Sequence, residues 1–409
     1  MNIQALKRPQ TAPFLPYGRQ LIEEDDIKAV AEVLRGEMLT TGPMVRRFEE
    51  AFAEIVKTKH AIACSSGTAA LYMAARALGL GPGAKVIVPS LTFLATASAP
   101  YLNGAEIVFA DVDPQTGLMR PQDLADAIAR AGRADAVFNV HLNGQCGALE
   151  EIAELARGAG LKIVDDACHA LGTVYIAGNG TPCPIGANDL CDLSVFSFHP
   201  VKAIAMGEGG AATTNDPEIA ARLSRARNHG MTREANEFVL TEEAFDADGT
   251  ANPWYYELLE PGFNWRASDI HCALALSQLG KLDRFLARRR ALAVAYDELL
   301  APYAPRLKPV ARPKNCLPAL HLYAVLIDFA SFGLTRAQFV RRLAEEGIGS
   351  QVHYFPLHRQ RYFASRYGVA ELPGAEGYYA RVLSLPFFAS MDEDDVGRVV
   401  VAMEKILKL

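Results

Sequence analysis

The segment Leu193-Ser194-Val195-Phe196-Ser197-Phe198-His199-Pro200-Val201-Lys202 decides how this chain is interpreted. Its first part, Leu193–Phe198, has the composition of a buried strand, and the remainder is a turn that ends in a lysine. A lysine at the end of an apolar strand is partly desolvated, which lowers the pKa of the amine and makes it a better nucleophile. Lys202 is therefore a candidate nucleophile. A surface lysine in a loop is the alternative interpretation of the same motif.

The chemistry that most needs such a lysine is Schiff-base formation with pyridoxal phosphate, whose ring acts as an electron sink. Ser197 lies five positions before Lys202 and could offer its hydroxyl to the phosphate of that cofactor. Because short motifs mislead when taken alone, the rest of the chain has to decide between the two interpretations.

Short apolar runs alternate with helical patterns over the first half of the chain. The predicted strands are Ala61–Cys64, Val86–Pro89, Glu106–Ala110, Ala136–Val140, Leu161–Val164, Leu193–Phe198 and Gly210–Thr214. The predicted helices are Glu23–Arg35, Ala69–Leu78, Thr96–Asn103, Pro121–Ala131, Leu149–Ala159 and Pro217–Asn228. This alternation predicts an α/β fold with a large, mostly parallel sheet covered by helices on both faces.

At 409 residues the chain is too long for one ordinary core, and we predict two domains. Residues 1–265 form the large domain, which includes an N-terminal arm and helix. Residues 266–409 form a linking long helix and a smaller α/β domain. Its predicted elements are a helix Ser268–Leu299, a strand Leu320–Asp328, a helix Arg336–Glu346, a strand Gly349–His353 and a closing helix Asp392–Leu407. The segment Asn236–Gly262, first acidic and then aromatic, is predicted to be a functional loop or an interface arm.

Composition narrows the class of protein. Half of the residues are hydrophobic and 22% are charged, as in an ordered enzyme, and the net charge of -6 predicts no binding to nucleic acid or anionic membranes. No apolar run approaches the roughly 20 residues of a membrane span, and Met1–Pro16 lacks the apolar region of a secretory signal. The seven cysteines form no CxxC pair, so we expect free thiols, no metal site and a cytoplasmic location.

Polar residues follow several of the predicted strands, and ligands of open α/β sheets bind beyond the carboxyl ends of the strands. Ser65-Ser66-Gly67-Thr68 opens a helix, so Gly67 and Thr68 could hold a phosphate through free backbone N–H groups. An ordinary capped turn is the alternative. Asp165 and Asp166 end the predicted strand Leu161–Val164, and because side chains alternate along a strand, one of them can face the ligand.

A carboxylate beside a pyridine nitrogen keeps that nitrogen protonated, and His169 could bond the ring hydroxyl. An N-cap aspartate with a structural histidine is the alternative. Phe93 could stack on a flat ring or belong to the core. His141–Gln145, His353 and Tyr354 also follow predicted strands, the last two as candidates for substrate contact. Each of these could equally be a structural polar residue.

The sequence lacks the motifs of three other α/β classes. No GxGxxG follows a predicted strand, no GxxxxGK[ST] is present and no GxSxG is present. These absences argue against a nicotinamide-dependent Rossmann enzyme, a P-loop NTPase and an α/β-hydrolase.

Taken together, these residues resemble the DegT/StrS family of sugar aminotransferases, which are pyridoxal phosphate enzymes of fold type I. The resemblance covers nearly the whole chain. It rests on Leu39–Pro43, Ser66–Leu71, Asp111–Pro114, His141–Gln145, Asp165–His169, Ser197–Lys202, Gly207–Gly210, Asn228–Gly230, Gly262–Arg266, His353-Tyr354 and Leu383–Pro386.

The resemblance implies a role for each matching position. Lys202 would form the Schiff base with the cofactor, and Asp166 would pair with the pyridinium nitrogen. The remaining cofactor residues would be His169 near the ring hydroxyl, Phe93 stacked on the ring, and Gly67, Thr68 and Ser197 at the phosphate. Asn264 would reach the phosphate of the neighbouring subunit's cofactor, which implies a homodimer with shared active sites. Asp165 departs from the family, where many members carry Glu.

Within the family, Ser197–Lys202 and the Pro253–Asn264 arm are most similar to the aminotransferase of the pseudaminic acid pathway. This similarity implies transfer of an amino group from L-glutamate to a UDP-linked 4-keto-6-deoxy-N-acetyl sugar. Other nucleotides (GDP or dTDP) and a ketone at carbon 3 remain open, as do a dehydratase and a pyridoxal phosphate-binding regulator on the same scaffold. The presence of Lys202 favours transamination.

Overall fold

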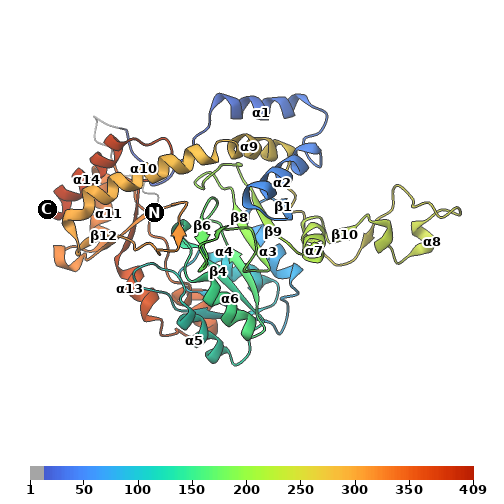
Figure 1. The fold of residues 1–409 in the computed structure, drawn as a ribbon, viewed down its shortest axis with the longest axis horizontal. Coiled ribbons are helices and arrows are strands. Elements are labelled where there is room, and N and C mark those ends of the chain that lie inside the picture. Colours follow the sequence, from blue (N-terminus) through green and yellow to red (C-terminus); the bar gives the residue numbers. More distant parts are fainter. Residues whose placement is uncertain (1–12) are drawn as a thin grey trace.

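The computed structural model describes residues 13–409 and shows an α/β sheet with a smaller unit at one end (Figure 1). Residues 1–12, which include most of the segment considered for a secretory signal, lie outside the described residues. The main sheet has the strand order β1-β9-β8-β5-β4-β2-β3. Its strands are β1 (His60–Cys64), β2 (Lys85–Pro89), β3 (Glu106–Ala110), β4 (Ala136–Val140), β5 (Lys162–Asp166), β8 (Leu193–Ser197) and β9 (Gly210–Thr214). Strands β3, β2, β4, β5 and β8 are parallel, and β9 runs antiparallel to both of its neighbours.

Helices cover both faces of this sheet, as the apolar strands predict. One face packs against α3 (Gly67–Ala77), α4 (Leu94–Leu102) and α7 (Pro217–Arg227). The other packs against α2 (Pro43–Val56), α5 (Pro121–Ala131), α6 (Leu149–Gly158) and α9 (Asp269–Leu279). Within β2, Val86 and Val88 join the first core and Ile87 joins the opposite one, because successive side chains of a strand point to opposite faces. The predicted fold class is confirmed.

The long helix predicted over Ser268–Leu299 is two helices, and that prediction was wrong. Helix α9 ends at Leu279, and α10 (Leu282–Leu300) begins after Gly280 and Lys281. Lys281 has φ −108° and ψ 1°, outside the helical geometry, and its backbone N–H bonds the Gln278 carbonyl. The break turns the Lys281 side chain toward α1 (Glu24–Arg35), which lies along α9 (Figure 1).

The smaller unit has a core of its own. Strands β12 (Leu307–Pro309), β14 (Tyr323–Ile327) and β15 (Val382–Leu385) form an antiparallel sheet that packs against α10, α11 (Arg336–Glu345) and α14 (Glu393–Leu407). Helices α12 (Arg361–Tyr367) and α13 (Pro373–Arg381) instead pack Phe363 and Tyr378 into the core of the main sheet. The C-terminal part of the chain thus contributes to both cores. The boundary between residues 265 and 266 stays a prediction.

The strand predicted over Gly349–His353 is not formed. The segment pairs one residue at a time with two different partners. The Gly349 N–H bonds the Leu15 carbonyl at 2.7 Å, and Gln351 forms an isolated bridge with Ser384. Since neither pairing continues, the residues stay irregular and can line a cavity.

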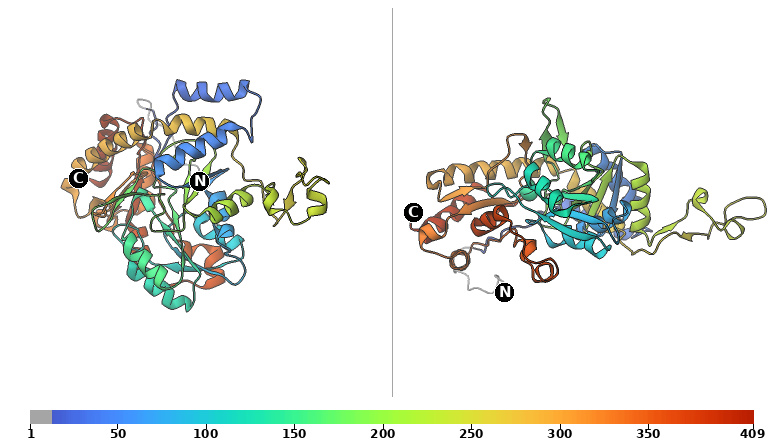
Figure 2. Two further views of the ribbon diagram at one scale, coloured as in Figure 1. Left: turned by 45° about the vertical axis from the view of Figure 1, so that its right-hand side comes forward. Right: turned by 90° about the horizontal axis from the view of Figure 1, so that it is seen from below.

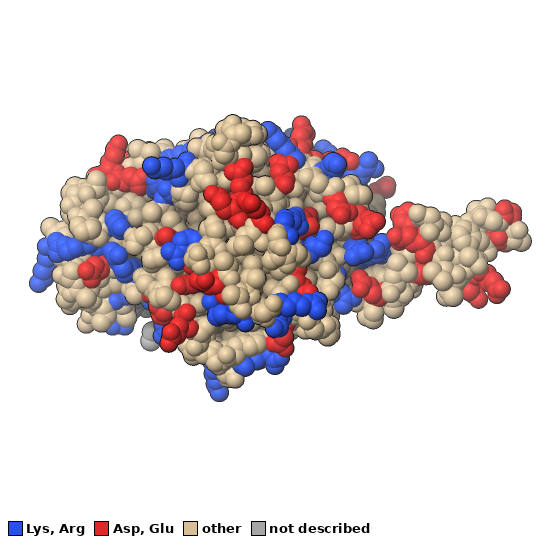
Figure 3. All heavy atoms as spheres, turned by 60° about the horizontal axis from the view of Figure 1, so that its bottom comes forward, with Lys and Arg blue, Asp and Glu red and all other residues tan. Residues whose placement is uncertain are grey.

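Residues 236–262 belong to an arm that projects from the body (Figures 1 and 2). The arm contains α8 (Thr241–Ala244) and the short strand pair β10 (Met231–Thr232) and β11 (Glu257–Leu258). A second short sheet, elsewhere on the molecule, joins β6 (Val174–Ile176), β7 (Pro182–Pro184) and β13 (Cys316–Leu317). Residues 236–262 include no lysine or arginine, and acidic side chains are spread along the arm (Figure 3).

Over residues 13–409, no helix combines the length and the apolar character that crossing a bilayer requires.

Candidate functional site

A cavity of about 550 Å³ opens at the carboxyl ends of the parallel strands, between the main sheet and the smaller unit. Nearly all of the residues predicted for cofactor and substrate line it: Gly67, Thr68, Phe93, Asp166, His169, Ser197, Lys202, His353 and Tyr354. They come from β5, β8, the starts of α3 and α4, and the irregular segment before α12. The fold therefore brings together groups that are up to 287 positions apart in the sequence, Gly67 and Tyr354 being the extremes.

Lys202 reaches the cavity from the turn that follows β8. Its backbone N–H bonds the His199 carbonyl at 2.8 Å, which closes the turn. The surrounding protein removes water from the amine, and this burial lowers the pKa of Lys202 below the usual value for lysine, although interactions with Cys168 and Asp166 oppose the shift. A lowered pKa increases the fraction of neutral amine, the form that attacks a carbonyl carbon.

The start of α3 forms an anion cradle beside Ser197. The Ser66 side chain accepts a hydrogen bond from the Ala69 N–H at 3.1 Å and so caps the helix. The first N–H groups of a helix have no partner within it, which leaves those of Gly67 and Thr68 for a ligand. Space here is limited, because a Cβ on Gly67 would lie 2.9 Å from the Ser197 Cβ and 3.1 Å from the Cys168 Sγ.

Asp166 is the acidic residue of β5 that faces the cavity. Its Oδ2 accepts a hydrogen bond from the Thr96 hydroxyl at 2.6 Å, and its Oδ1 accepts one from the Cys168 N–H at 3.2 Å. Thr96 in turn is 2.7 Å from the Thr92 hydroxyl. These contacts hold the carboxylate in one orientation, so that its remaining acceptor capacity is directed into the cavity.

Asp165 points to the opposite side of the strand, where it contacts His141. The His141 Nε2 lies 3.2 Å from the Asp165 Oδ2, and both side chains are buried. Burial alone would lower the pKa of His141, but the charge and hydrogen bond of Asp165, together with smaller contributions from Cys316 and Asp166, outweigh burial and raise that pKa. His141 is absent from the cavity wall and Asn143 bonds Tyr378, so this stretch is structural, as the alternative interpretation allowed.

Histidines and a tyrosine also line the cavity. The His169 Nε2 is 3.1 Å from the Tyr354 hydroxyl, and the His169 ring centroid is 4.3 Å from that of His321. The His353 Nδ1 is 2.8 Å from the Ser384 hydroxyl. Burial and the nearby Lys202 charge lower the pKa of His353 to about 3, and the same two causes hold the pKa values of His169 and His321 well below the usual range. These rings are neutral at pH 7 and act as hydrogen-bonding groups.

Two of the predicted site residues, Phe93 and Asn264, are exposed. Phe93 precedes α4 and is 53% exposed at the mouth of the cavity, 6.0 Å from the Tyr354 ring, so it is not a core residue. Asn264 does not line the cavity of its own chain. It is exposed at the base of the arm, where it pairs with Asn228.

Sequence reasoning missed several cavity residues: Tyr17, Thr92, Thr96, His321, Gln351 and Gln360. Thr96 was placed in a helix, and only the packing of α4 against β5 brings it to Asp166. Tyr17 lies in an irregular N-terminal segment with no pattern to mark it. The signal for His321 was weak, since a histidine within a predicted strand, Leu320–Asp328, has many structural explanations.

The cavity fits the pyridoxal phosphate expected from the sequence. The anion cradle suits a phosphate, the fixed Asp166 carboxylate suits a pyridinium nitrogen, and the Lys202 amine suits an aldehyde. In addition, the buried Nδ1 of His169 has no hydrogen-bond partner among the described residues, as expected of a group that awaits a ligand.

Comparison with known proteins identifies the relatives of this chain. Residues 20–404 match the model of the DegT/DnrJ/EryC1/StrS aminotransferase family. The spore coat polysaccharide biosynthesis protein SpsC of Bacillus subtilis (strain 168) is 37% identical over 398 residues, which cover 97% of either chain.

Solved structures agree. PseC of Helicobacter pylori, an aminotransferase of pseudoaminic acid biosynthesis, superposes with a TM-score of 0.86 at 28% identity, covering 97% of this chain and 99% of that one. DesI, solved in the presence of its TDP-sugar product, gives 0.82 at 32% identity, covering 97% and 93%. The putative sugar aminotransferase Spr1654 of Streptococcus pneumoniae gives 0.83 at 25% identity, covering 97% and 99%, and is solved in PLP and PMP forms.

The family match covers most of the chain, and the cavity holds the groups that such a cofactor needs. The protein is a pyridoxal phosphate-dependent sugar aminotransferase, and it belongs to the DegT/DnrJ/EryC1/StrS aminotransferase family.

Proposed function

We propose that this enzyme transfers the amino group of L-glutamate to a nucleotide-linked 4-keto-6-deoxy sugar, forming a UDP-4-amino-4,6-dideoxy-N-acetyl sugar. The observation that carries the proposal is the convergence of the Lys202 amine, the fixed Asp166 carboxylate and the α3 anion cradle on one cavity. The PseC and DesI structures support a sugar substrate, and DesI supports its attachment to a nucleotide.

In this proposal each residue has a physical task. Bound pyridoxal phosphate supplies an aldehyde that condenses with amines and a ring that accepts electron density. Gly67 and Thr68 donate backbone N–H groups to the phosphate, and Ser197 donates its hydroxyl. Asp166, held by Thr96, keeps the ring nitrogen protonated.

Lys202 has two tasks that follow from its position. Its Nζ would hold the cofactor until the donor amine displaces it. Its Nζ, now free and with a lowered pKa, then moves a proton to or from the reacting carbon as general acid and base, a contribution of about 10²- to 10⁴-fold in rate. His169 would bond the ring hydroxyl, and His353 and Tyr354 would contact substrate, a proposal supported by the position of all three in the cavity wall.

A homodimer with shared sites completes the proposal. Asn264 lies outside its own cavity, as expected of a residue that serves the neighbouring subunit. The arm supports the same assembly, because it exposes large apolar side chains without a core to cover them: Val239 is 75% exposed and Trp254 72%. A second copy of the chain would bury this surface.

Replacing Lys202 tests the catalytic assignment. We expect Lys202→Ala to lose the visible absorption band of lysine-bound cofactor and all turnover. The matched control is Lys59→Ala, on a lysine outside the cavity, which should keep both. Turnover retained by Lys202→Ala refutes the assignment.

A substrate panel tests the reaction. Purified enzyme with L-glutamate is offered UDP-, GDP- and dTDP-linked sugars with a ketone at carbon 3 or 4, and products are read by mass spectrometry. The proposal expects amination of the UDP-linked 4-keto-6-deoxy-N-acetyl sugar in preference to the others. Loss of water without gain of nitrogen would instead indicate a dehydratase, and cofactor binding without any conversion would indicate a regulator.

A further inference from the structure

An extended N-terminal segment forms part of the cavity wall and packs on the loop that carries Lys202. We call residues 15–21 the strap. The Leu15 N–H bonds the Gly347 carbonyl at 2.9 Å, and the Tyr17 carbonyl accepts a hydrogen bond from the Phe387 N–H at 3.0 Å. Tyr17 lines the cavity, with its ring 5.6 Å from that of His353. A Cβ on Gly18 would lie 3.6 Å from the Val201 Cβ, so the strap is in contact with the residue before Lys202.

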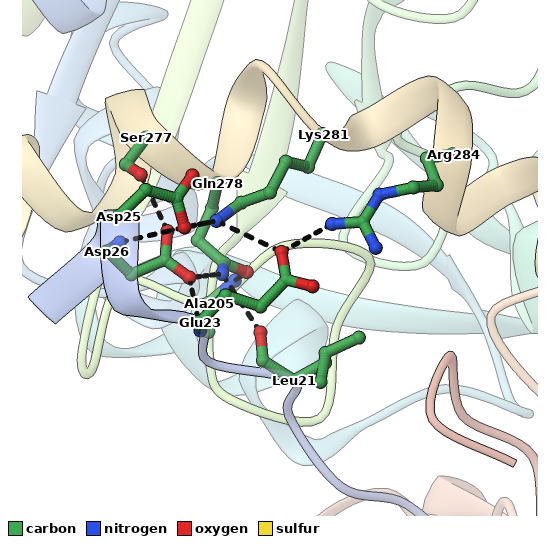
Figure 4. Close-up of polar contacts among 9 residues, drawn as sticks. All are labelled: Leu21, Glu23, Asp25, Asp26, Ala205, Ser277, Gln278, Lys281 and Arg284. Carbon is green, nitrogen blue, oxygen red and sulfur yellow. Dashed lines mark hydrogen bonds and ion pairs between the residues drawn. The ribbon is translucent and has the colours of Figure 1, made fainter.

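One buried amide joins the end of the strap to residues 199–206, the loop that carries Lys202, which we call the lysine loop. Gln278, on the last turn of α9, is 1% exposed. Its Nε2 donates to the Leu21 carbonyl at 2.9 Å and to the Asp26 Oδ2 at 2.7 Å, while its Oε1 accepts from the Ala205 N–H at 3.3 Å (Figure 4). Leu21 ends the strap, and Ala205 lies three residues after Lys202.

The orientation of this amide is fixed by its partners. Leu21 and Asp26 present acceptors, which require the NH₂ group, and Ala205 presents a donor, which requires the oxygen. Asp26 is itself immobile because it is fully buried and bonds the Ser277 hydroxyl and the Lys281 amine, both at 2.6 Å (Figure 4). The amide therefore fixes the position of the Leu21 backbone relative to the Ala205 backbone.

The lysine loop needs an external support of this kind. Its own backbone bonds are Lys202 N–H to the His199 carbonyl at 2.8 Å and Met206 N–H to the Phe198 carbonyl at 2.9 Å. The N–H of Ala205 lies between these and is buried, and it bonds Gln278. A catalytic group acts from a narrow range of positions, and a displacement of about 1 Å can cost about 100-fold in rate.

We propose that Gln278 is a positioning residue for the transamination: it locks the strap to the lysine loop, so that Tyr17 and Lys202 face the same substrate. The proposal rests on the proposed role of Lys202. Gln278 itself touches neither substrate nor cofactor, because it lies behind the loop and outside the cavity wall.

The test combines amide hydrogen exchange with kinetics on the cofactor-loaded enzyme. In the unaltered protein we expect the Ala205 amide to be protected. In Gln278→Met, which keeps the size of the side chain but removes its polar atoms, exchange at Ala205 and in the strap should rise. The cofactor absorption band should be retained, and kcat should fall about 10- to 100-fold with a smaller change in KM.

Two further variants separate positioning from general damage. Ser277→Ala removes one bond to Asp26 on the same helical turn without touching Ala205 or Leu21, so kcat and Ala205 protection should stay near the unaltered values. Gln278→Glu keeps an acceptor for Ala205 but loses the donors to both Leu21 and Asp26 and places a second carboxylate beside Asp26, so exchange should rise more in the strap than at Ala205.

Three results would overturn the proposal: an Ala205 amide unprotected in the unaltered protein, unchanged Ala205 exchange in Gln278→Met, or a kcat for that variant equal to that of Ser277→Ala. The first needs no variant and stays decisive if a substituted chain does not fold. An error in the role of Lys202 would show separately, as turnover in Lys202→Ala.

Discussion

Gly67 illustrates how a single residue sets the fit of the cofactor. An alanine Cβ would lie 2.9 Å from the Ser197 Cβ, closer than side-chain atoms normally approach, so the start of α3 or Ser197 would have to move. We expect Gly67→Ala to weaken cofactor binding by about 1–3 kcal/mol, measured by fluorescence titration of the cofactor-free enzyme.

Gly158 provides the matched control for that substitution. It ends α6 and has open space where a Cβ would stand. Gly158→Ala should leave cofactor affinity unchanged and raise stability by up to about 1 kcal/mol. Equal cofactor affinities of the two variants would argue against the anion cradle.

His353 should make the stability of the cofactor-free protein depend on pH. Its folded pKa of about 3 lies below the value of about 6.5 in an unfolded chain, so the unfolded state binds the proton first and stability falls as the pH drops from about 6.5 toward 3. Between pH 7 and pH 5 this group alone contributes a loss of about 2 kcal/mol.

The measurement is urea denaturation at the two pH values. His353→Gln should lose about 2 kcal/mol less over that interval than the unaltered protein. Identical losses would mean that the buried imidazole accepts a proton in the folded state.

For individual residues, the sequence predicted which positions belong to the site but not which way their side chains point. It placed Asp165 and Asp166 at a strand end, and alternation required them to point in opposite directions. Which of them faces the cavity depends on which side of β5 carries α4, because Thr96 on that helix bonds Asp166.

Among the elements, the break between α9 and α10 matters for stability because it places the Lys281 amine beside the buried Asp26 carboxylate. The Lys281 amine is 2.6 Å from Asp26 and 2.7 Å from Asp25. Burial alone would raise the pKa of Asp26, but hydrogen bonds led by that of Lys281 hold it below the usual value. The ion pair therefore fastens α1 to the break.

We expect Lys281→Met to destabilise the protein by about 3 kcal/mol, because it leaves Asp26 charged and buried with only neutral donors. Thermal or urea unfolding would measure this. The control is Arg46→Met at the exposed pair with Glu50, whose side chains are 83% and 60% exposed and whose loss should change stability little. A similar effect of both substitutions would mean that the Asp26 pair is not buried in solution.

Helices were predicted well where residues at their ends marked a start and a stop, and poorly where the apolar pattern continued across a break. Pro121–Ala131 matches α5 residue for residue, since a proline begins it and a glycine follows it. The predicted Ser268–Leu299 helix hid a break at Gly280, because its apolar residues continue on both sides.

For the whole molecule, the proposed shared sites make a complementation experiment possible. Lys202→Ala and Asn264→Ala subunits would each form defective homodimers. Mixed and reassociated, they should regain about a quarter of normal activity, because half of the dimers are mixed and each of these has one intact site.

Sedimentation should give a species of twice the 44.3 kDa chain mass. Unaltered Asn264→Ala activity, or no gain on mixing, would show that each cavity is complete within its own chain. Removing residues 239–258 from the arm should shift the equilibrium toward monomers, because this surface has no cover within the chain.

The sequence by itself determined the α/β class, the apolar strands and the polar groups at their carboxyl ends, because hydrophobic periodicity and strand-end chemistry are local properties of the chain. Only the tertiary structure decided that Thr96 orients Asp166, that His321 and Tyr17 join the wall, and that Gln278 ties the strap to the lysine loop. Those contacts join residues tens to hundreds of positions apart. Their geometry follows from how helices and strands pack, and no local pattern of residues encodes it.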